Sequence, residues 1–102
     1  MTSKERAYLR GLANSIDPIF QIGKTGLSNN LIEQLSNALE ARELIKITVL
    51  ETAPDTAKNL STEIADQTKS VVVQVIGSKI TLFKQKEKNS KYNMISNEKS
   101  NK

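Results

Sequence analysis

The sequence predicts an α/β (α+β) fold, in the order α-β-α-β-α-β-β, in which helices pack on a mixed four-stranded sheet. Three stretches carry apolar residues at spacings of three and four positions, which is the periodicity of amphipathic helices. Between and after them lie short runs rich in Ile and Val, which favour strands. The last two runs flank Gly77-Ser78, a two-residue hairpin signal. Two strand-helix-strand crossovers followed by a hairpin therefore predict a mixed sheet.

Local signals delimit the first helix and the first strand. Thr2 and Glu5 have the spacing of a capping box, in which each side chain satisfies a backbone N–H of the other residue. Apolar residues follow at helical spacing, and Asp17-Pro18 is expected to end the helix. Residues 19–22 are apolar except for Gln21, and they are too few for a helix, so they predict a strand.

The remaining elements follow the same logic. Ser28 is a candidate N-cap for a helix whose apolar stripe runs from Leu31 to Leu39. Residues 44–50 alternate in polarity and predict a strand. Pro54 suits the first turn of a third helix. Residues 71–76 are β-branched except Gln74, which predicts a central strand, and residues 79–83 return antiparallel to it.

A change in charge divides the chain into residues 1–84, expected to be one domain, and 85–102, expected to be a basic, disordered tail. Residues 1–83 carry nine basic and nine acidic residues, whereas residues 84–102 carry six lysines and two glutamates. The whole net charge of +4 therefore lies at the end of the chain. Such a tail attracts a polyanion such as nucleic acid, or only improves solubility.

The absent residue types exclude most catalytic chemistry. The chain has no His and no Cys, so the usual general base, the commonest metal ligands and disulfides are all missing. We therefore expect no enzyme activity, no metal and no cofactor. Gly23-Lys24-Thr25 resembles the end of a nucleotide-binding P-loop, but Pro18 stands where that motif needs a glycine. Since no apolar run could span a membrane, we expect a cytoplasmic protein without a membrane partner.

One loop remains as a candidate site. Gly23-Lys24-Thr25-Gly26 lies between a predicted strand and a predicted helix. Glycines let a ligand approach the main chain, the start of the following helix favours a phosphate, and Lys24 adds a cation. A G-x-x-G loop that clamps a nucleic-acid backbone is the device of KH domains. By itself the pattern is equally typical of a tight turn.

The residues around this loop resemble the YhbY family, the stand-alone bacterial form of the CRM domain. The resemblance spans residues 3–84 with the spacing intact. It rests on Tyr8-Leu9-Arg10-Gly11-Leu12-Ala13, on Ile22-Gly23-Lys24-Thr25-Gly26-Leu27-Ser28, on residues 38–47 (ALEARELIKI), on Val73-Gln74-Val75-Ile76-Gly77-Ser78-Lys79 and on Leu82-Phe83-Lys84. The chain departs from the family pattern where Asn14 replaces a common histidine and Phe83-Lys84 replaces a Tyr-Arg pair, outside the glycine loop.

This resemblance implies a fold like the C-terminal domain of translation initiation factor three, with the fourth strand antiparallel to the others. It also implies that the protein binds ribosomal RNA in precursors of the large ribosomal subunit. The expected RNA-binding residues are Gly23, Lys24, Thr25, Gly26, Ser28, Arg10 and Lys46. A Cβ added at either glycine is expected to obstruct the RNA.

Several of these residues also have simpler roles. Ser28 is equally suited to be only a helix cap. Arg10 lies with Lys4 and Arg6 on the polar side of its helix, which is typical of a solvated face. Lys46 is close enough in sequence to pair with Glu43. The competing functions are an assembly adaptor that binds protein through the sheet face around Leu44 and Leu50, and a small phosphotransferase or nuclease. We expect a monomer.

Overall fold

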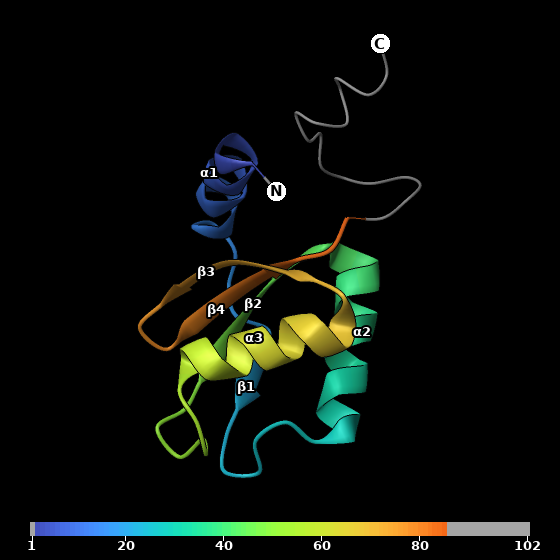
Figure 1. Cartoon of the computed structure of the whole chain (residues 1–102), viewed down its shortest axis with the longest axis vertical. Helices are drawn as coiled ribbons and strands as arrows, with labels where there is room; N and C mark the ends of the chain where they lie inside the picture. The colour runs from blue at the N-terminus through green and yellow to red at the C-terminus, as the bar shows by residue number, and fades with distance from the viewer. Residues whose placement is uncertain (1, 86–102) are drawn as a thin grey trace.

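The computed structural model describes residues 2–85, which form three helices and four strands in the predicted order (Figure 1). The elements are α1 (Ser3–Ala13), β1 (Phe20–Ile22), α2 (Asn29–Arg42), β2 (Leu44–Val49), α3 (Ala57–Thr68), β3 (Val71–Ile76) and β4 (Lys79–Phe83). The predicted α+β class with its mixed four-stranded sheet is therefore confirmed. Of the expected disordered tail, residues 85–102, only Gln85 is described, and residues 86–102 lie outside the described residues.

The strands lie in the order β1-β2-β4-β3. β1 and β2 are parallel, and β4 runs antiparallel to both of its neighbours. The prediction that β3 is central was wrong, because the hairpin inserts β4 between β2 and β3 and leaves β3 at the edge. Its end residues Val71 and Ile76 are accordingly 39% and 64% exposed.

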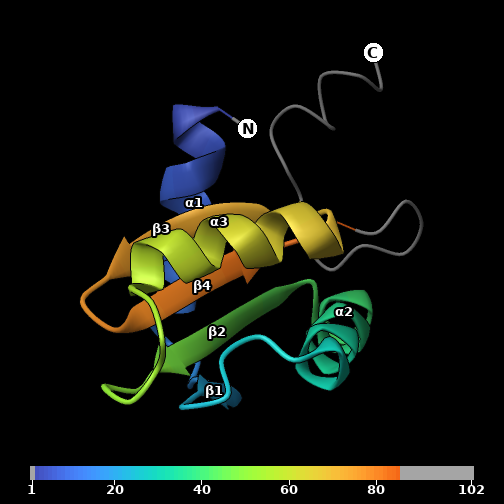
Figure 2. The same ribbon diagram turned by 60° about the horizontal axis from the view of Figure 1, so that its bottom comes forward.

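Helices cover both faces of the sheet and give it two cores (Figures 1 and 2). α2 and α3 pack on one face over a cluster that includes Ile22, Ile45, Ile47, Ile80 and Leu82. α1 packs on the other face, where Leu9 lies over Leu44, Val73 and Phe83. Leu44 was expected to add to an exposed apolar face, but α1 buries it to 4% exposure.

The helices begin where polar side chains accept their first N–H groups. The capping box of Thr2 and Glu5 at the start of α1 is confirmed, as is the N-cap Ser28 of α2. Pro54 was expected in the first turn of α3, but the helix begins only at Ala57. Thr56 is its N-cap, with Thr56 Oγ1 accepting from the Asn59 N–H, so Pro54 stays in the preceding loop.

Two basic side chains fix α1 on the sheet. Lys46 Nζ donates to Ala13 O at 2.9 Å and to Ile16 O at 3.3 Å, so it satisfies carbonyls at the end of α1. This helix ends four residues before Asp17, the expected boundary. Arg6 Nη1 donates to the carbonyls of Val72 and Val73 at 2.6 and 2.9 Å, where a bulge interrupts the β3–β4 pairing. Arg6 is therefore a packing residue of the fold.

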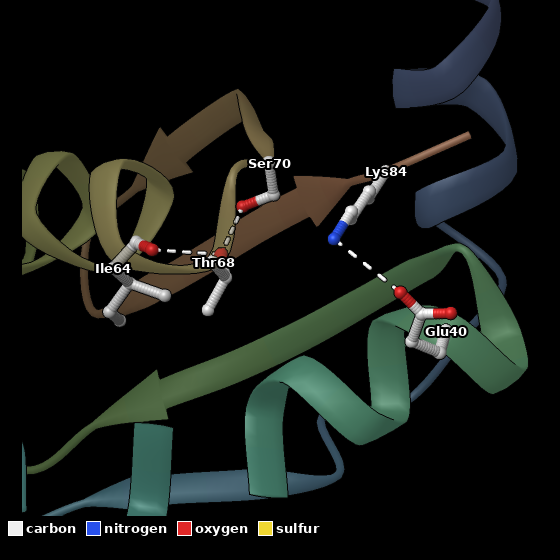
Figure 3. A network of polar contacts seen from close by, with 5 residues as sticks. All are labelled: Glu40, Ile64, Thr68, Ser70 and Lys84. Atoms are coloured by element: carbon white, nitrogen blue, oxygen red, sulfur yellow. Dashed lines mark hydrogen bonds and ion pairs between the residues drawn. The ribbon is translucent and has the colours of Figure 1, made fainter. Parts of the chain in front are cut away.

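Polar contacts also close the end of the sheet where β3 begins and β4 stops (Figure 3). Thr68 Oγ1 donates to Ile64 O at 2.8 Å, so Ser70 Oγ donates to Thr68 Oγ1, also at 2.8 Å. Lys84 Nζ lies 3.5 Å from a carboxylate oxygen of Glu40. Both side chains of that pair reach solvent, so it contributes little stability. Within residues 2–85, no helix has the length and apolarity needed to cross a bilayer.

Candidate nucleic-acid interface

Three loops meet at one end of the sheet, where β1, β2 and β3 all finish. They are residues 23–28 after β1, residues 50–56 after β2 and the Gly77-Ser78 turn between β3 and β4. The Leu50 N–H donates to Ile22 O at 2.9 Å, and the Val49 N–H donates to Ser78 O at 2.7 Å. These bonds hold the loop after β2 to the end of β1 and the hairpin turn to the end of β2. In Figure 1 the loops after β1 and β2 are at the bottom, the turn between β3 and β4 is at the left, and α1 is at the top.

The glycine loop is a closed turn with an exposed tip. The Gly26 N–H donates to Gly23 O at 2.9 Å, which closes the turn around Lys24 and Thr25. Both of these side chains are exposed, whereas Gly26 is buried. Gly26 has a φ of +68°, a conformation that L-residues with side chains rarely adopt. The turn therefore presents an ammonium group and a hydroxyl to solvent.

The glycines themselves face the protein, contrary to the expectation that a Cβ there would meet the RNA. A Cβ on Gly26 would lie 2.9 Å from Pro54 Cγ, closer than real Cβ contacts allow. A Cβ on Gly23 would lie 3.6 Å from Leu50 Cδ1 and 3.8 Å from Thr52 Oγ1, which is ordinary contact. The second glycine thus lets the two loops pack together.

The start of α2 adds hydrogen-bond donors beside the loop. Ser28 Oγ accepts from the Leu31 N–H at 3.1 Å, which confirms the capping role and leaves the hydroxyl hydrogen free to donate outward. Asn29 and Asn30 are exposed, and the first turn has no acidic residue. Sequence reasoning missed these two amides, although they directly follow the N-cap. The positive end of this helix dipole therefore faces solvent without a neutralising carboxylate.

At the start of α3, by contrast, the carboxylate of Asp55 offsets the positive end of the helix dipole. Asp55 accepts hydrogen bonds from Asn59 Nδ2 at 3.0 Å and from the Thr56 N–H at 2.7 Å. These two bonds, of which the bond from Asn59 has the larger effect, hold the pKa of Asp55 below its ordinary value of 3.8. Asp55 is therefore ionised at neutral pH and supplies the negative charge that this helix end favours. An external phosphate is better accommodated at α2.

The other two expected site residues lie apart from the loop. Arg10 is exposed on α1, and in Figure 1 this helix is at the top, whereas the glycine loop is at the bottom. Lys46 is on β2, and its ammonium donates to the Ala13 and Ile16 carbonyls at the end of α1. The fold brings Gly23, Lys24, Thr25, Gly26 and Ser28 together, and it does not bring Arg10 or Lys46 to them.

The exposed groups at this end are hydrogen-bond donors and charged side chains. The glycine loop and the start of α2 present the Lys24 ammonium, hydroxyls and amides, all of which can donate to phosphate oxygens. Lys79 follows the hairpin turn, and the carboxylates of Glu51 and Asp55 are exposed in the loop after β2. Among residues 2–85, no three carboxylates converge on a point where they could hold a metal ion. The chain as a whole has neither His nor Cys.

Comparison with known proteins gives the family. The model of the CRS1 / YhbY (CRM) domain matches residues 1–84. The chain belongs to this family. The match covers all seven described elements of the CRM domain, from α1 to β4.

Two relatives are similar to this chain in length, and one solved structure has a similar fold. The Probable RNA-binding protein YqeI of Bacillus subtilis is 39% identical over 89 residues, which are 87% of this chain and 93% of YqeI. An RNA-binding protein of Haemophilus influenzae is 31% identical, over 85% of this chain and 88% of its own. The solution structure of the hypothetical protein SAV1595 from Staphylococcus aureus superposes with a TM-score of 0.78 and 45% identity, covering 92% of this chain and 98% of that one.

Proposed function

We propose that this CRM protein binds ribosomal RNA in precursors of the large ribosomal subunit, and that its glycine loop grips the RNA backbone. The observation that carries the proposal is the exposed Lys24-Thr25 tip, held beside a helix start that has no acidic residue in its first turn. Relatives of similar length are named as RNA-binding proteins. Ribosomal RNA is the partner implied by the family resemblance.

Physical chemistry favours a backbone contact over base readout. A phosphate at the α2 start would meet the Lys24 ammonium, the Thr25 and Ser28 hydroxyls and the helix dipole together. These groups recognise charge and shape, and they distinguish the four bases poorly. Aromatic side chains that could stack on bases are scarce, since the chain has only four and Phe83 is buried in the core. The protein would therefore recognise folded RNA by its backbone.

The rest of the chain fits a small non-enzymatic assembly factor. We propose that residues 1–84 fold as one independent domain and act as a monomer in the cytoplasm, where bacterial ribosomes assemble. The five lysines and two glutamates of residues 86–102 would add a nonspecific attraction for RNA.

The adaptor hypothesis has less support. It relied on an apolar sheet face around Leu44 and Leu50, but Leu44 lies under α1 and Leu50 lies in the loop after β2. Protein binding through Leu44 would therefore need α1 to move.

Crosslinking in cells followed by sequencing of the attached RNA tests the proposal. We expect crosslinks concentrated in the RNA of the large subunit, and we expect the protein to co-sediment with large-subunit precursors and not with mature ribosomes. Crosslinks spread over messenger RNA, or none above an untagged control, would contradict it. The Lys24→Ala variant, tested in parallel, connects the RNA signal to the loop.

A further inference from the structure

α1 covers only part of its face of the sheet, and the uncovered part borders the glycine loop. Leu44, Lys46 and Thr48 point to this face, because side chains alternate along a strand and Leu44 packs against α1. α1 covers Leu44, and its end is bonded to Lys46. Thr48, one step further along β2, lies beyond the helix and is only half-buried.

A row of polar side chains crosses the sheet at this position. Gln21 on β1 pairs with Thr48 on β2, and Thr48 pairs with Lys79 on β4, so the three side chains share one face. We call these three residues the polar strip. Gln21 and Lys79 are exposed. Within residues 2–85, no hydrogen bond or ion pair engages any of the three side chains.

A shallow pocket adjoins the strip on the β1 side. It has a volume of about 610 Å³ and is lined by Pro18, Ile19, Phe20, Gln21 and Thr48. This volume is within the range of sites that hold small organic groups. Pro18 and Ile19 give it an aliphatic part, and Gln21 and Thr48 add an amide and a hydroxyl, while the Phe20 side chain packs in the core on the other face of the sheet. An aliphatic wall beside hydrogen-bonding groups suits the ribose of a nucleotide.

We propose that the polar strip and its pocket bind the ribonucleotide that adjoins the phosphate held at the glycine loop, with Gln21 and Thr48 recognising a ribose 2′-hydroxyl. This inference rests on the proposed function and extends its surface. Gln21 lies on β1 two residues before Gly23, which begins the loop, so one RNA chain can follow the strand from the loop to the strip. The 2′-hydroxyl both donates and accepts, as do an amide and a hydroxyl together.

Charge favours RNA over a protein segment as the occupant. The only charged residue of the strip is Lys79, which lies two strands from Gln21, about 10 Å away. A chain that crosses the strip would thus meet a cation at each end, Lys24 in the loop and Lys79 in the hairpin. A neutral apolar peptide would leave Lys79 without a partner, although Ile76 beside it is 64% exposed.

Site-specific photocrosslinking separates this inference from the proposed function. A photoreactive benzoylphenylalanine replaces Thr25 in the loop, Gln21 in the strip or Thr62 on the exposed side of α3, and each protein is irradiated with transcribed large-subunit ribosomal RNA. We expect crosslinks from positions 25 and 21 and only background from 62. Crosslinks from 25 but not from 21 would overturn the strip and leave the loop. Background at all three positions, or equal yields at all three, would overturn both.

Selectivity for ribose gives a second measurement that does not depend on crosslinking. The probes are a mixed-sequence single-stranded oligoribonucleotide and the DNA of the same sequence. In Gln21→Ala and in Thr48→Val we expect the preference for RNA to fall about threefold to tenfold, the effect of one lost neutral hydrogen bond. Lys79→Ala should weaken binding of both probes about equally, whereas the matched Lys4→Ala on α1 should not. An unchanged RNA preference in both polar variants would overturn the ribose contact.

Discussion

Gly26 and Pro54 are in direct packing contact, so the second glycine of the G-x-x-G loop touches the loop that precedes α3. A Cβ at Gly26 would lie 2.9 Å from Pro54 Cγ and 3.4 Å from Pro54 Cδ, and the backbone there has a φ of +68°. Two separate constraints therefore require glycine. Both constraints act in the free protein. The second glycine of this motif is therefore required for the fold itself, whether or not RNA is bound.

Gly26→Ala should destabilise the fold. A side chain at positive φ costs about 1–2 kcal/mol, and the Pro54 ring must also shift. For a domain of this size the Tm should fall by roughly 5–15 °C, as measured by thermal unfolding.

Gly23→Ala is the control for this change. Its Cβ would make only ordinary contacts, with Leu50 and Thr52, and its φ lies outside the positive region. Stability should change by less than about 0.5 kcal/mol. If Gly26→Ala unfolded no more easily than Gly23→Ala, the packing between the two loops would carry no energetic weight.

Lys24→Ala should affect RNA binding without affecting stability, since this side chain is exposed at the tip of the turn. We expect a loss of about tenfold to a hundredfold in affinity for large-subunit ribosomal RNA, the value of one charge-assisted hydrogen bond. The slope of log affinity against log salt should fall by about one unit. Filter binding at two salt concentrations measures both. Equal affinities for wild type and variant would mean that the loop is only a turn.

Lys46→Met should affect stability without affecting RNA binding. Methionine keeps the apolar stem and removes the ammonium that satisfies the Ala13 and Ile16 carbonyls. We expect a loss of stability of about 1–2 kcal/mol in urea unfolding and faster amide exchange in α1. The salt slope of RNA binding should stay the same. A slope reduced by one unit in a fully folded sample would mean that Lys46 contacts RNA.

Arg6→Met and Arg10→Met form a matched pair on one helix. Only Arg6 bonds to the β3 bulge, while Arg10 is exposed, and Arg and Met have similar helix propensities. We expect Arg6→Met to cost about 1–2 kcal/mol and Arg10→Met less than about 0.5 kcal/mol in urea unfolding. Equal costs would mean that the contact between Arg6 and the bulge adds nothing to the attachment of α1.

Removal of residues 86–102 should weaken RNA binding without abolishing it. The segment carries five lysines and two glutamates, so its contribution is electrostatic and salt should erase it. The truncated protein should unfold at the same temperature as the full chain. A lower Tm would show that the domain extends beyond residue 84, and an unchanged affinity at low salt would exclude a role in binding.

Much of this fold is encoded in local signals. The capping box at Thr2, the N-cap at Ser28 and the Gly77-Ser78 turn act within a few residues of chain, so sequence reasoning placed them correctly. Pro54 misled it, because a proline is equally compatible with a first helical turn and with a loop. The packing of Pro54 against Gly26 is a contact between loops that are far apart in sequence, so no local pattern predicts it.

The kinds of elements, their order and the loop that carries Lys24 could all be predicted from the sequence, since they depend on periodicity and on residues close together in the chain. Which basic residues are available to RNA depends instead on tertiary packing. Arg6 and Lys46 look like surface cations in the sequence, yet the packing of α1 on the sheet directs both to backbone carbonyls. Gln21, Thr48 and Lys79 look unrelated, yet strand pairing puts them in one row beside the loop. The reason is physical: hydrogen bonds between distant segments depend on strand register and helix docking, which the burial of two separate cores determines.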